Sequence, residues 1–444
     1  MGSNWETVCI DRIKSPQKYS CVGGPFGSSL SRKHYVDSGV PVIRGVNLSG
    51  DIFSESEFVF VSPEKSQELQ RNMAFRGDLV FTQRGTLGQV ALIPENSDYE
   101  CYVVSQSQMK LTVDPTKADP YFIYSYFRSK EAKTLIEKSA IVGGVPHINL
   151  GILKDFRLRL PSLSVQQAVS KIAKDFDRKV MLNNQINQTL EQMAQAIFKS
   201  WFVDFDPVKA KMNGEQPEGM DAATASLFPE KLVESELGLI PEGWKVGTLK
   251  DIATFQNGYA FKGKDWTEEG FPVVKIGSVK PGIVDLKSCS YVAGQTVESL
   301  ERFKLNIGDI LVGMTGYVGE TGLVPQSTVA PYLNQRVGRL TPLSQSRYEL
   351  LYVIVRNTAY KQFAEAQAQG SAQANVSGKA LMSYPIVIPS EKLIEKFSDL
   401  IAPMIKQKLT FSAQCEWLAQ TRDTLLPKLL SGEIELGQSV EVPE

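Results

Sequence analysis

One fragment of the sequence has the spacing of a nucleotide-binding motif. The fragment GYAFKGKD begins at Gly258 and places glycine and lysine as a phosphate-binding loop does. In such a loop a Ser or Thr follows the lysine and reaches the magnesium ion, but here the next residue is Asp265. Because a carboxylate would repel the phosphates, we expect no nucleotide site at this fragment.

A second fragment, ADPYF around Asp119, resembles the Asp-Pro-Pro-Tyr motif of enzymes that methylate amino groups, but it lacks the second proline. Asp followed by Pro is also the usual start of a helix, with Asp as the N-cap and Pro at the first helical position. We therefore expect a helix to begin at Asp119 rather than a catalytic site.

Histidines and cysteines do not form a recognisable metal or catalytic cluster. His34 and His147 are the only histidines, and neither lies beside a nucleophile or a group of carboxylates in the sequence. The cysteines include no Cys-x-x-Cys pair, which argues against a disulfide framework or a zinc site; they are Cys9, Cys21, Cys101, Cys289 and Cys415. The sequence favours a binding protein that has no catalytic residue, no metal and no cofactor of its own.

Length and composition indicate several folded domains. A chain of 444 residues exceeds what one core usually supports, and 42% hydrophobic with 22% charged residues is typical of a globular protein. The net charge of −1 does not exclude a basic face that binds nucleic acid. We find no apolar run of about 18 to 20 residues and no signal sequence, so we expect a cytoplasmic protein without a membrane partner.

The sequence contains one pattern twice. GDLVFTQRGTLGQVALIP from Gly77 corresponds to GDILVGMTGYVGETGLVP from Gly308. HINLGILKDFRLRLPS from His147 corresponds to NVSGKALMSYPIVIPS from Asn375, at nearly the same offset. Each copy combines short strand-like runs, punctuated by Gly and Pro, with an internal helix. The sequence therefore predicts an α+β protein with two repeated mixed α/β domains.

A long helix with heptad spacing follows each copy. Apolar residues recur at steps of three and four from Val165, and they recur again from the corresponding Leu393. Two such helices are expected to pair, with Lys179 and Gln407 as matched polar positions, and Pro403 is expected to kink the second helix or delay its regular start. The alternative is that each helix packs only on its own domain. The expected seam residues are Ile172, Phe176, Ile186, Leu190, Met193, Leu400, Met404, Phe411, Leu418 and Leu425.

These patterns give a division of the chain. A sequence mixing Pro, Gly and acidic residues without a sustained period separates the first helix from the second copy and is expected to be an irregular connector. The predicted segments are domain 1 at 1–161, a central helix at 162–202, the connector at 203–243, domain 2 at 244–389, a C-terminal helix at 390–434 and a tail at 435–444.

The two copies keep the Gly and Pro residues that shape the backbone and differ in the polar residues between them. This is the pattern expected of two modules that dock alike on one polymer but read different features of it. Arg fits the edge of guanine, and Asn or Gln fits adenine, while other Lys and Arg residues hold phosphates. The candidate base readers are Arg44, Gln83, Arg84, Thr86, Ser105, Gln106, Lys275, Thr315, Tyr317, Asn334, Gln335 and Arg336. The candidate phosphate contacts are Arg32, Lys33, Lys262 and Lys264.

Three further stretches carry a family resemblance. They are LNNQINQTLEQMAQAIFKSWFVDFDP from Leu182, GLIPEGW from Gly238 and TLLPKLLSGEI from Thr424. With GPFGSSL from Gly24 they resemble specificity subunits of type I restriction-modification systems, over essentially the whole chain. The resemblance implies two target recognition domains held apart by an antiparallel coiled coil, and a bipartite double-stranded DNA site with two different half-sites.

The same resemblance implies partners. Two DNA-methylating subunits would dock on the chain and supply S-adenosylmethionine binding and adenine methylation. A motor and nuclease subunit would supply ATP- and Mg-dependent translocation and cleavage. Two alternatives stay open: an orphan specificity subunit of a modification-only methyltransferase, and a bilobal scaffold that binds protein or carbohydrate instead of DNA.

Overall fold

The computed structural model describes residues 5–368 and 374–434, so the expected tail at 435–444 lies outside the described residues. The chain divides into two compact units, unit 1 with Met1–Val180 and Trp417–Glu444, and unit 2 with Met181–Glu416. Each long helix, α6 (Leu163–Phe202) and α13 (Glu391–Ser431), contributes one end to each unit. Among the described helices, none has the length and apolar character needed to cross a membrane.

Unit 1 contains the first copy of the repeat. A five-stranded sheet has the order β3 (Tyr35–Val36), β5 (Val59–Val61), β4 (Val40–Ile43), β9 (Cys101–Val104) and β6 (Met73–Phe75). A four-stranded sheet has the order β2 (Cys21–Gly23), β10 (Gln108–Leu111), β7 (Leu79–Thr82) and β8 (Val90–Leu92), and β1 (Glu6–Cys9) pairs with β11 (Arg157–Leu160). The helices before α6 are α1 (Ile10–Ile13), α2 (Pro63–Glu68), α3 (Pro120–Arg128), α4 (Lys130–Lys138) and α5 (Leu150–Asp155).

Unit 2 contains the second copy. A six-stranded sheet has the order β15 (Ala253–Asn257), β24 (Val337–Pro342), β21 (Ile310–Gly313), β22 (Thr321–Leu323), β19 (Gly282–Val284) and β18 (Val279–Lys280). A four-stranded sheet has the order β16 (Trp266–Thr267), β20 (Ser290–Val292), β17 (Phe271–Val274) and β23 (Tyr332–Leu333), and β14 (Lys245–Thr248) pairs with β25 (Pro385–Ile388). The helices of the second copy before α13 are α9 (Gly294–Val297), α10 (Tyr348–Arg356), α11 (Thr358–Gln367) and α12 (Gly378–Met382).

The strands of the two copies pair in the same register, which confirms the predicted α+β repeat. Leu79 of β7 lies opposite Leu92 of β8, and at the corresponding positions of the second copy Ile310 of β21 lies opposite Leu323 of β22. The parallel pair β4–β9 is likewise repeated as β17–β23. Unit 2 adds the β18–β19 pair at the edge of its larger sheet.

The Gly-Asp dipeptide that opens both repeated phrases has a structural role. Asp78 pairs with Lys110 over 3.0 Å, and the corresponding Asp309 pairs with Arg339 over 3.1 Å. The same carboxylate also accepts a backbone N–H three residues before it, at Phe75 or Asn306. Because the pair in unit 1 is almost fully buried, each partner must be present to neutralise the other. This aspartate recurs because it fixes the turn and the neighbouring strand.

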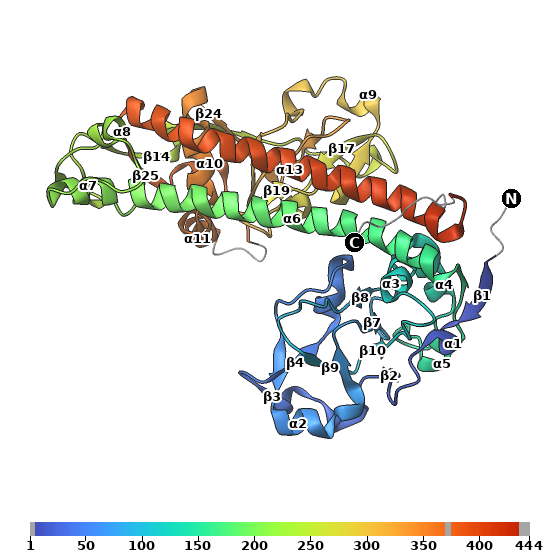
Figure 1. Cartoon of the computed structure of the whole chain (residues 1–444). Helices are drawn as coiled ribbons and strands as arrows, with labels where there is room; N and C mark the ends of the chain where they lie inside the picture. The colour runs from blue at the N-terminus through green and yellow to red at the C-terminus, as the bar shows by residue number, and fades with distance from the viewer. Residues whose placement is uncertain (1–4, 369–373, 435–444) are drawn as a thin grey trace. The chain divides into compact units, whose positions relative to one another are not determined.

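The two long helices run side by side (Figure 1), and the contacts within each unit make them antiparallel. In unit 2, Asn183 contacts Gln414, and further along, Glu191 contacts Lys408. Asn187 lies between them and donates to Ser412 over 3.2 Å. The predicted pairing is therefore confirmed.

The polar residues that set the register differ from those expected. Lys179 and Gln407 are exposed, and the polar contacts between the helices include those of Asn183, Asn187 and Glu191 instead. In an antiparallel pair, homologous positions face each other only near the midpoint, and Lys179 and Gln407 lie away from it, because Asn183 already faces Gln414. The expectation for Lys179 and Gln407 was therefore wrong.

The prediction that Met193 and Leu400 lie in the seam was also wrong, because these side chains are 46% and 43% exposed. Their neighbours Ala194 and Ile401 are buried instead. The remaining expected seam residues are partly buried, namely Ile172, Phe176, Ile186, Leu190, Met404, Phe411, Leu418 and Leu425. The buried stripe drifts by one residue along the helix because the helix ends also pack on the sheets, as an ordinary amphipathic helix does.

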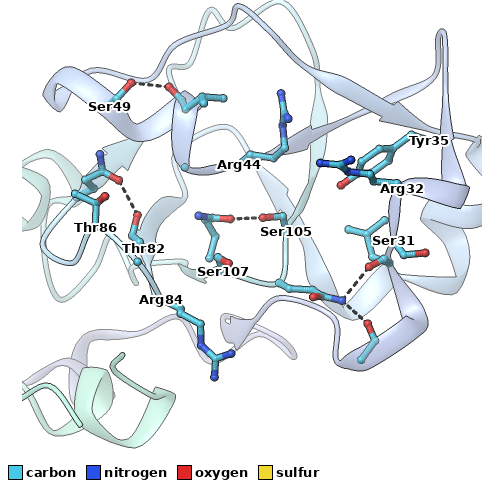
Figure 2. Close-up of a pocket in the computed structure, with 18 residues that line it drawn as sticks. Ser31, Arg32, Tyr35, Arg44, Ser49, Thr82, Arg84, Thr86, Ser105 and Ser107 are labelled. Atoms are coloured by element: carbon cyan, nitrogen blue, oxygen red, sulfur yellow. Dashed lines mark hydrogen bonds between the residues drawn. The ribbon is translucent and has the colours of Figure 1, made fainter. Parts of the chain in front are cut away.

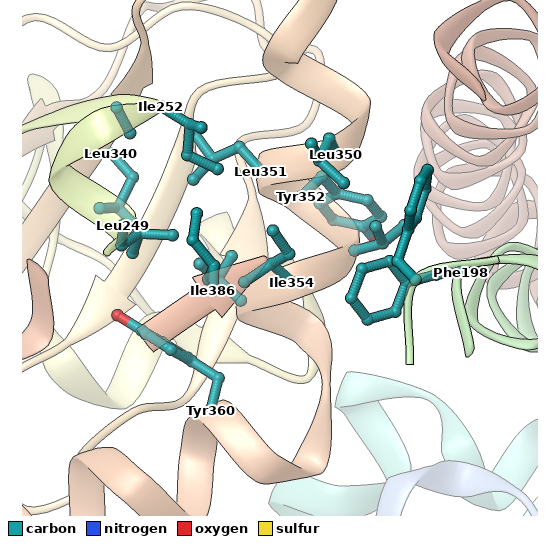
Figure 3. Packing of buried hydrophobic residues seen from close by; sticks show 14 of the residues in the cluster. Phe198, Leu249, Ile252, Leu340, Leu350, Leu351, Tyr352, Ile354, Tyr360 and Ile386 are labelled. Carbon is teal, nitrogen blue, oxygen red and sulfur yellow. The ribbon is translucent and has the colours of Figure 1, made fainter. Parts of the chain in front are cut away.

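Each unit has its own hydrophobic core that includes one end of each long helix. In unit 1, Val169 and Ala173 of α6 and Leu426 of α13 pack with Phe122 and Phe127 of α3. In unit 2, the cluster in Figure 3 joins Phe198 of α6 with residues of α10, β24 and β25. The helices therefore pair with each other and also pack on the domains, so both packing modes foreseen from the sequence occur together.

The connector at 203–243 is more ordered than its composition predicts. It forms α7 (Asp206–Met212), α8 (Ala222–Ser226) and a hairpin of β12 (Leu232–Ser235) and β13 (Gly238–Pro241). Phe205 and Phe228 pack with Trp244 in the core of unit 2, which holds these short elements in place. The expectation of an irregular connector was therefore wrong.

Candidate nucleic-acid interface

Unit 1 has an open pocket of about 780 Å³ where the ends of several strands and loops meet (Figure 2). Most of the residues that line it have polar side chains. The lining residues are Gly27, Leu30, Ser31, Arg32, Tyr35, Arg44, Gly45, Val46, Ser49, Thr82, Arg84, Gly85, Thr86, Gln89, Ser105, Gln106, Ser107 and Gln108. The fold thus brings together five of the six base-reading candidates of domain 1, whereas Gln83 is not in the lining.

The pocket is positively charged. Arg32, Arg44 and Arg84 contribute to its wall, and no Asp or Glu is among the lining residues. Three guanidinium groups without a carboxylate favour an anionic or strongly hydrogen-bonding ligand. The net charge of the chain does not show this local excess.

A turn after β7 carries Arg84 and Thr86 to the rim. The backbone N–H of Gln83 donates to Ser107 over 2.7 Å, and Gly85 has φ of +103°. A side chain at Gly85 would be strained at this angle, as at the corresponding Gly316, where φ is +77°. The repeated glycine therefore fixes a turn whose neighbouring side chains are free to differ.

Two expected base readers have their polar groups engaged within the protein. The Gln106 side-chain amide donates to the carbonyls of Gly27 and Leu30, the latter over 2.9 Å. The Ser105 hydroxyl donates to Gln108, which is buried. Gln106 is therefore placed to hold the loop at 24–30, and Ser105 to hold the next turn.

The arginines differ in how strongly the protein restrains them. Arg44 donates to the carbonyl of Glu57, and its buried Nε has no hydrogen-bond partner in the described structure. Arg84 and Arg32 are exposed, and no ion pair or side-chain hydrogen bond is recorded for them among the described residues. Lys33 lies beside Arg32 on the short turn Arg32–His34 and is also exposed. Arg84 and Arg32 are therefore the groups most available to a ligand.

In unit 2 the corresponding residues are engaged differently. Lys275, which corresponds to Arg44, donates to Ser290 over 2.7 Å and lies 3.7 Å from the ring centre of Trp266. Thr315, which corresponds to Arg84, donates to Asn375 over 2.8 Å. The two copies thus share a backbone but differ in which side chains remain available.

Asn334 is 5% exposed, and its side-chain oxygen accepts the backbone N–H of Arg336. Asn334 is therefore engaged in its own turn, which the sequence could not show, and its role as a base reader stays a prediction. Gln335 and Arg336 are exposed, as are Lys262 and Lys264, and Tyr317 is 64% exposed. These residues give unit 2 its own set of accessible polar and aromatic groups.

The two fragments that resembled enzyme motifs are helix starts. Asp119 caps α3 by accepting the N–H of Phe122 over 2.9 Å, as the sequence predicted. Asp265 closes a short turn by accepting the N–H of Lys262 over 2.7 Å. In the described parts of the chain, no three His, Cys, Asp or Glu residues lie together as a metal site would require.

Several pocket residues were missed from the sequence, among them Tyr35, Ser49, Gln89 and Gln108. Gln89 accepts a hydrogen bond from Thr82 over 3.1 Å, and Gln108 begins β10, a strand whose four residues are all buried. Gln108 lies two residues after Gln106, which recurs in the second copy, and this position could have indicated that Gln108 belongs to the pocket. The contacts between distant loops had no sequence signal.

The fold and this face define a class of protein: a tandem-domain binding protein whose copies share a frame and expose different residues. A family model described as the type I restriction modification DNA specificity domain matches residues 27–192 and again residues 241–409. Since the two matches cover well over half of the chain, the chain belongs to this family.

Individual relatives agree with this assignment. The chain is 26% identical over 405 residues to the type I restriction enzyme HindI specificity subunit of Haemophilus influenzae, covering 81% of this chain and 87% of that protein. It is 22% identical over 444 residues to the MjaIX specificity subunit of Methanocaldococcus jannaschii, covering 96% and 94%. The S subunit of a type I restriction-modification system from M. genitalium has the same fold, with a TM-score of 0.55, 16% identity and 96% coverage of both chains.

Proposed function

We propose that the chain is the DNA specificity subunit of a type I restriction-modification complex and reads a bipartite site whose two halves differ. One observation carries the proposal: Arg84 and Thr315 occupy corresponding turns of the two copies, but only in the first is a cation presented to solvent. Two such domains on one duplex would bind in the same manner and recognise different base pairs.

The charge of the unit 1 pocket supports DNA as the ligand. Arg side chains fit the major-groove edge of guanine with two hydrogen bonds, and each such pair discriminates by about 1 to 3 kcal/mol. Arg32 and Lys33, on the neighbouring turn, would hold phosphates and set position. Lys262 and Lys264 would do the same for the second domain.

We further propose that this chain is not itself catalytic and binds no cofactor. S-adenosylmethionine would be bound by two methylating subunits, and ATP with Mg by a motor and nuclease subunit. The paired helices, whose exposed residues include Met193 and Leu400, offer these partners a surface outside the two reading faces. A modification-only complex without the nuclease needs the same chain, and the subunits that co-purify with it distinguish the two cases.

A binding selection tests the proposal. The full chain, purified with its methylating subunits, is incubated with a library of random duplexes, and the bound duplexes are sequenced. We expect one motif with two unlike halves and a fixed gap, and binding that falls steeply with salt. Selection of no motif, with binding to a protein or glycan surface instead, would favour the scaffold alternative.

A further inference from the structure

Two exposed apolar side chains lie in loops that are joined to lining residues of the pocket of unit 1. Phe26 is 81% exposed and Val142 is 83% exposed, and no large apolar side chain elsewhere in residues 5–368 and 374–434 is more exposed. Phe26 precedes Gly27, which lines the pocket. Val142 lies in the 141–147 loop, and His147 of this loop forms an antiparallel backbone bridge with Arg84. Single exposed apolar residues are common, but the two most exposed ones lie in loops that are joined to residues lining the same pocket.

The loop that carries Phe26 is firmly held. Gly24 packs on Ser105 so closely that a Cβ would lie 1.9 Å from the Ser105 carbonyl oxygen. Gln106 donates to the carbonyls of Gly27 and Leu30, and Leu30 is buried in the core. The ring of Phe26 is therefore presented to solvent by a fixed backbone, which lowers the entropy lost when it binds a ligand.

We infer that Phe26 contacts the methyl group of a thymine in the half-site read by domain 1. This inference rests on the proposed function. The arginines that line the pocket fit groups in the major groove, and the thymine C5 methyl is the apolar group that the major groove displays. Charge complementarity to phosphate, from Arg32 and Lys33, brings the duplex to this face.

In the second domain an exposed aromatic residue comes from a different place. Gly258 makes the same close approach as Gly24, with a Cβ 2.1 Å from the Asn334 carbonyl oxygen, but Ala260 follows it where Phe26 follows Gly24. Tyr317, at the position of Thr86, is the exposed aromatic residue there. The thymine contact is thus expected of domain 1 by way of Phe26 alone.

A double-mutant cycle between protein and DNA tests the inference. The native chain and Phe26→Ala, each in complex with the methylating subunits, are titrated with site duplexes in which one thymine at a time is replaced by uracil. We expect one uracil substitution to weaken native binding about fourfold, from about 0.8 kcal/mol for a buried methyl group. The same substitution should leave Phe26→Ala, already about tenfold weaker, unchanged.

Matched variants separate this contact from a folding defect. Phe26→Leu should retain most of the thymine preference, and Phe75→Ala, at an aromatic residue that is 50% exposed, should keep the native uracil profile. The inference would be overturned if each uracil substitution changed the affinity of the native chain and of Phe26→Ala by the same factor. A recognition site with no A·T pair in either half would also overturn it. Loss of sequence-specific binding by the native chain would instead overturn the proposed function.

Discussion

Arg422 of α13 donates to the carboxylate of Asp177 of α6 over 2.7 Å, and both side chains are at least four-fifths buried. Arg128 and Tyr121 of α3 donate to the same carboxylate, over 2.5 and 2.6 Å. One acidic residue thus joins both long helices and the first domain within unit 1. In unit 2, Glu191 of α6 has the corresponding role, because Arg356 of α10 and Lys408 of α13 both donate to its carboxylate.

Replacing Asp177 should destabilise unit 1 strongly. Asp177→Ala leaves the buried guanidinium group of Arg128 without its counter-charge and leaves Arg422 with only the exposed Asp423, which costs about 3 to 5 kcal/mol. Denaturant unfolding of the full chain measures this cost. Asp175→Ala, at an exposed residue of the same helix, is the control and should change stability by less than about 0.5 kcal/mol. Equal effects of the two substitutions would contradict the proposed role of Asp177.

Acid should loosen the same junction. Burial acts to raise the pKa of Asp177. The charge of Arg128 and the hydrogen bonds from Arg128, Tyr121 and Arg422 lower this pKa by more than burial raises it, so the pKa lies below its ordinary value of 3.8. The stability from this pair is present above the unfolded-state pKa and is lost as pH falls through the folded-state pKa. Unfolding curves of the native chain and Asp177→Asn should therefore converge below about pH 4. A difference that persists unchanged at lower pH would contradict this assignment.

Gln106 should act on one half-site through the loop that it holds. Gln106→Ala removes the hydrogen bonds to Gly27 and Leu30, so amide hydrogen exchange at residues 24–30 should become faster. Discrimination in the half-site of domain 1 should weaken, and discrimination in the other half should remain native. A uniform loss across both halves would indicate a general folding defect.

Arg84 and Lys33 should affect binding in different ways. Arg84→Ala should cost about 1 to 3 kcal/mol and relax the preference at one base pair. Lys33→Ala should weaken binding to all sequences equally and reduce the slope of log affinity against log salt by about 0.9. Binding selections and salt titrations on the full complex measure both effects. A change in base preference caused by Lys33→Ala would reverse the roles assigned to these residues.

The helices should determine the gap between the half-sites. One heptad inserted into both α6 and α13 adds about 10 Å of helical rise, which corresponds to about 3 base pairs. A binding selection with this variant should return the same halves with a longer gap. An unchanged gap would exclude the helices as its determinant.

The sequence predicted the frame of the fold better than its surface. The constant offset between the two repeated phrases places Leu79 and Ile310 in equivalent registers, because alternating apolar strands and fixed glycine turns leave a local record in the sequence. The roles of Gln106 and Asn334 were not predictable, since both depend on loops that meet only in the folded chain. The partners of Asp177 also come from two distant segments, α3 and α13, and no periodicity marks them.

The central claim is that two copies of one frame read two different halves of one DNA site. Its most direct test is methylome sequencing of a host with this gene, without it, and with the gene carrying Arg84→Ala. We predict adenine methylation at a bipartite motif with two unlike halves that disappears without the gene, and relaxation of one half alone in the variant. Methylation at an unsplit motif, or a motif that persists without the gene, would contradict the account.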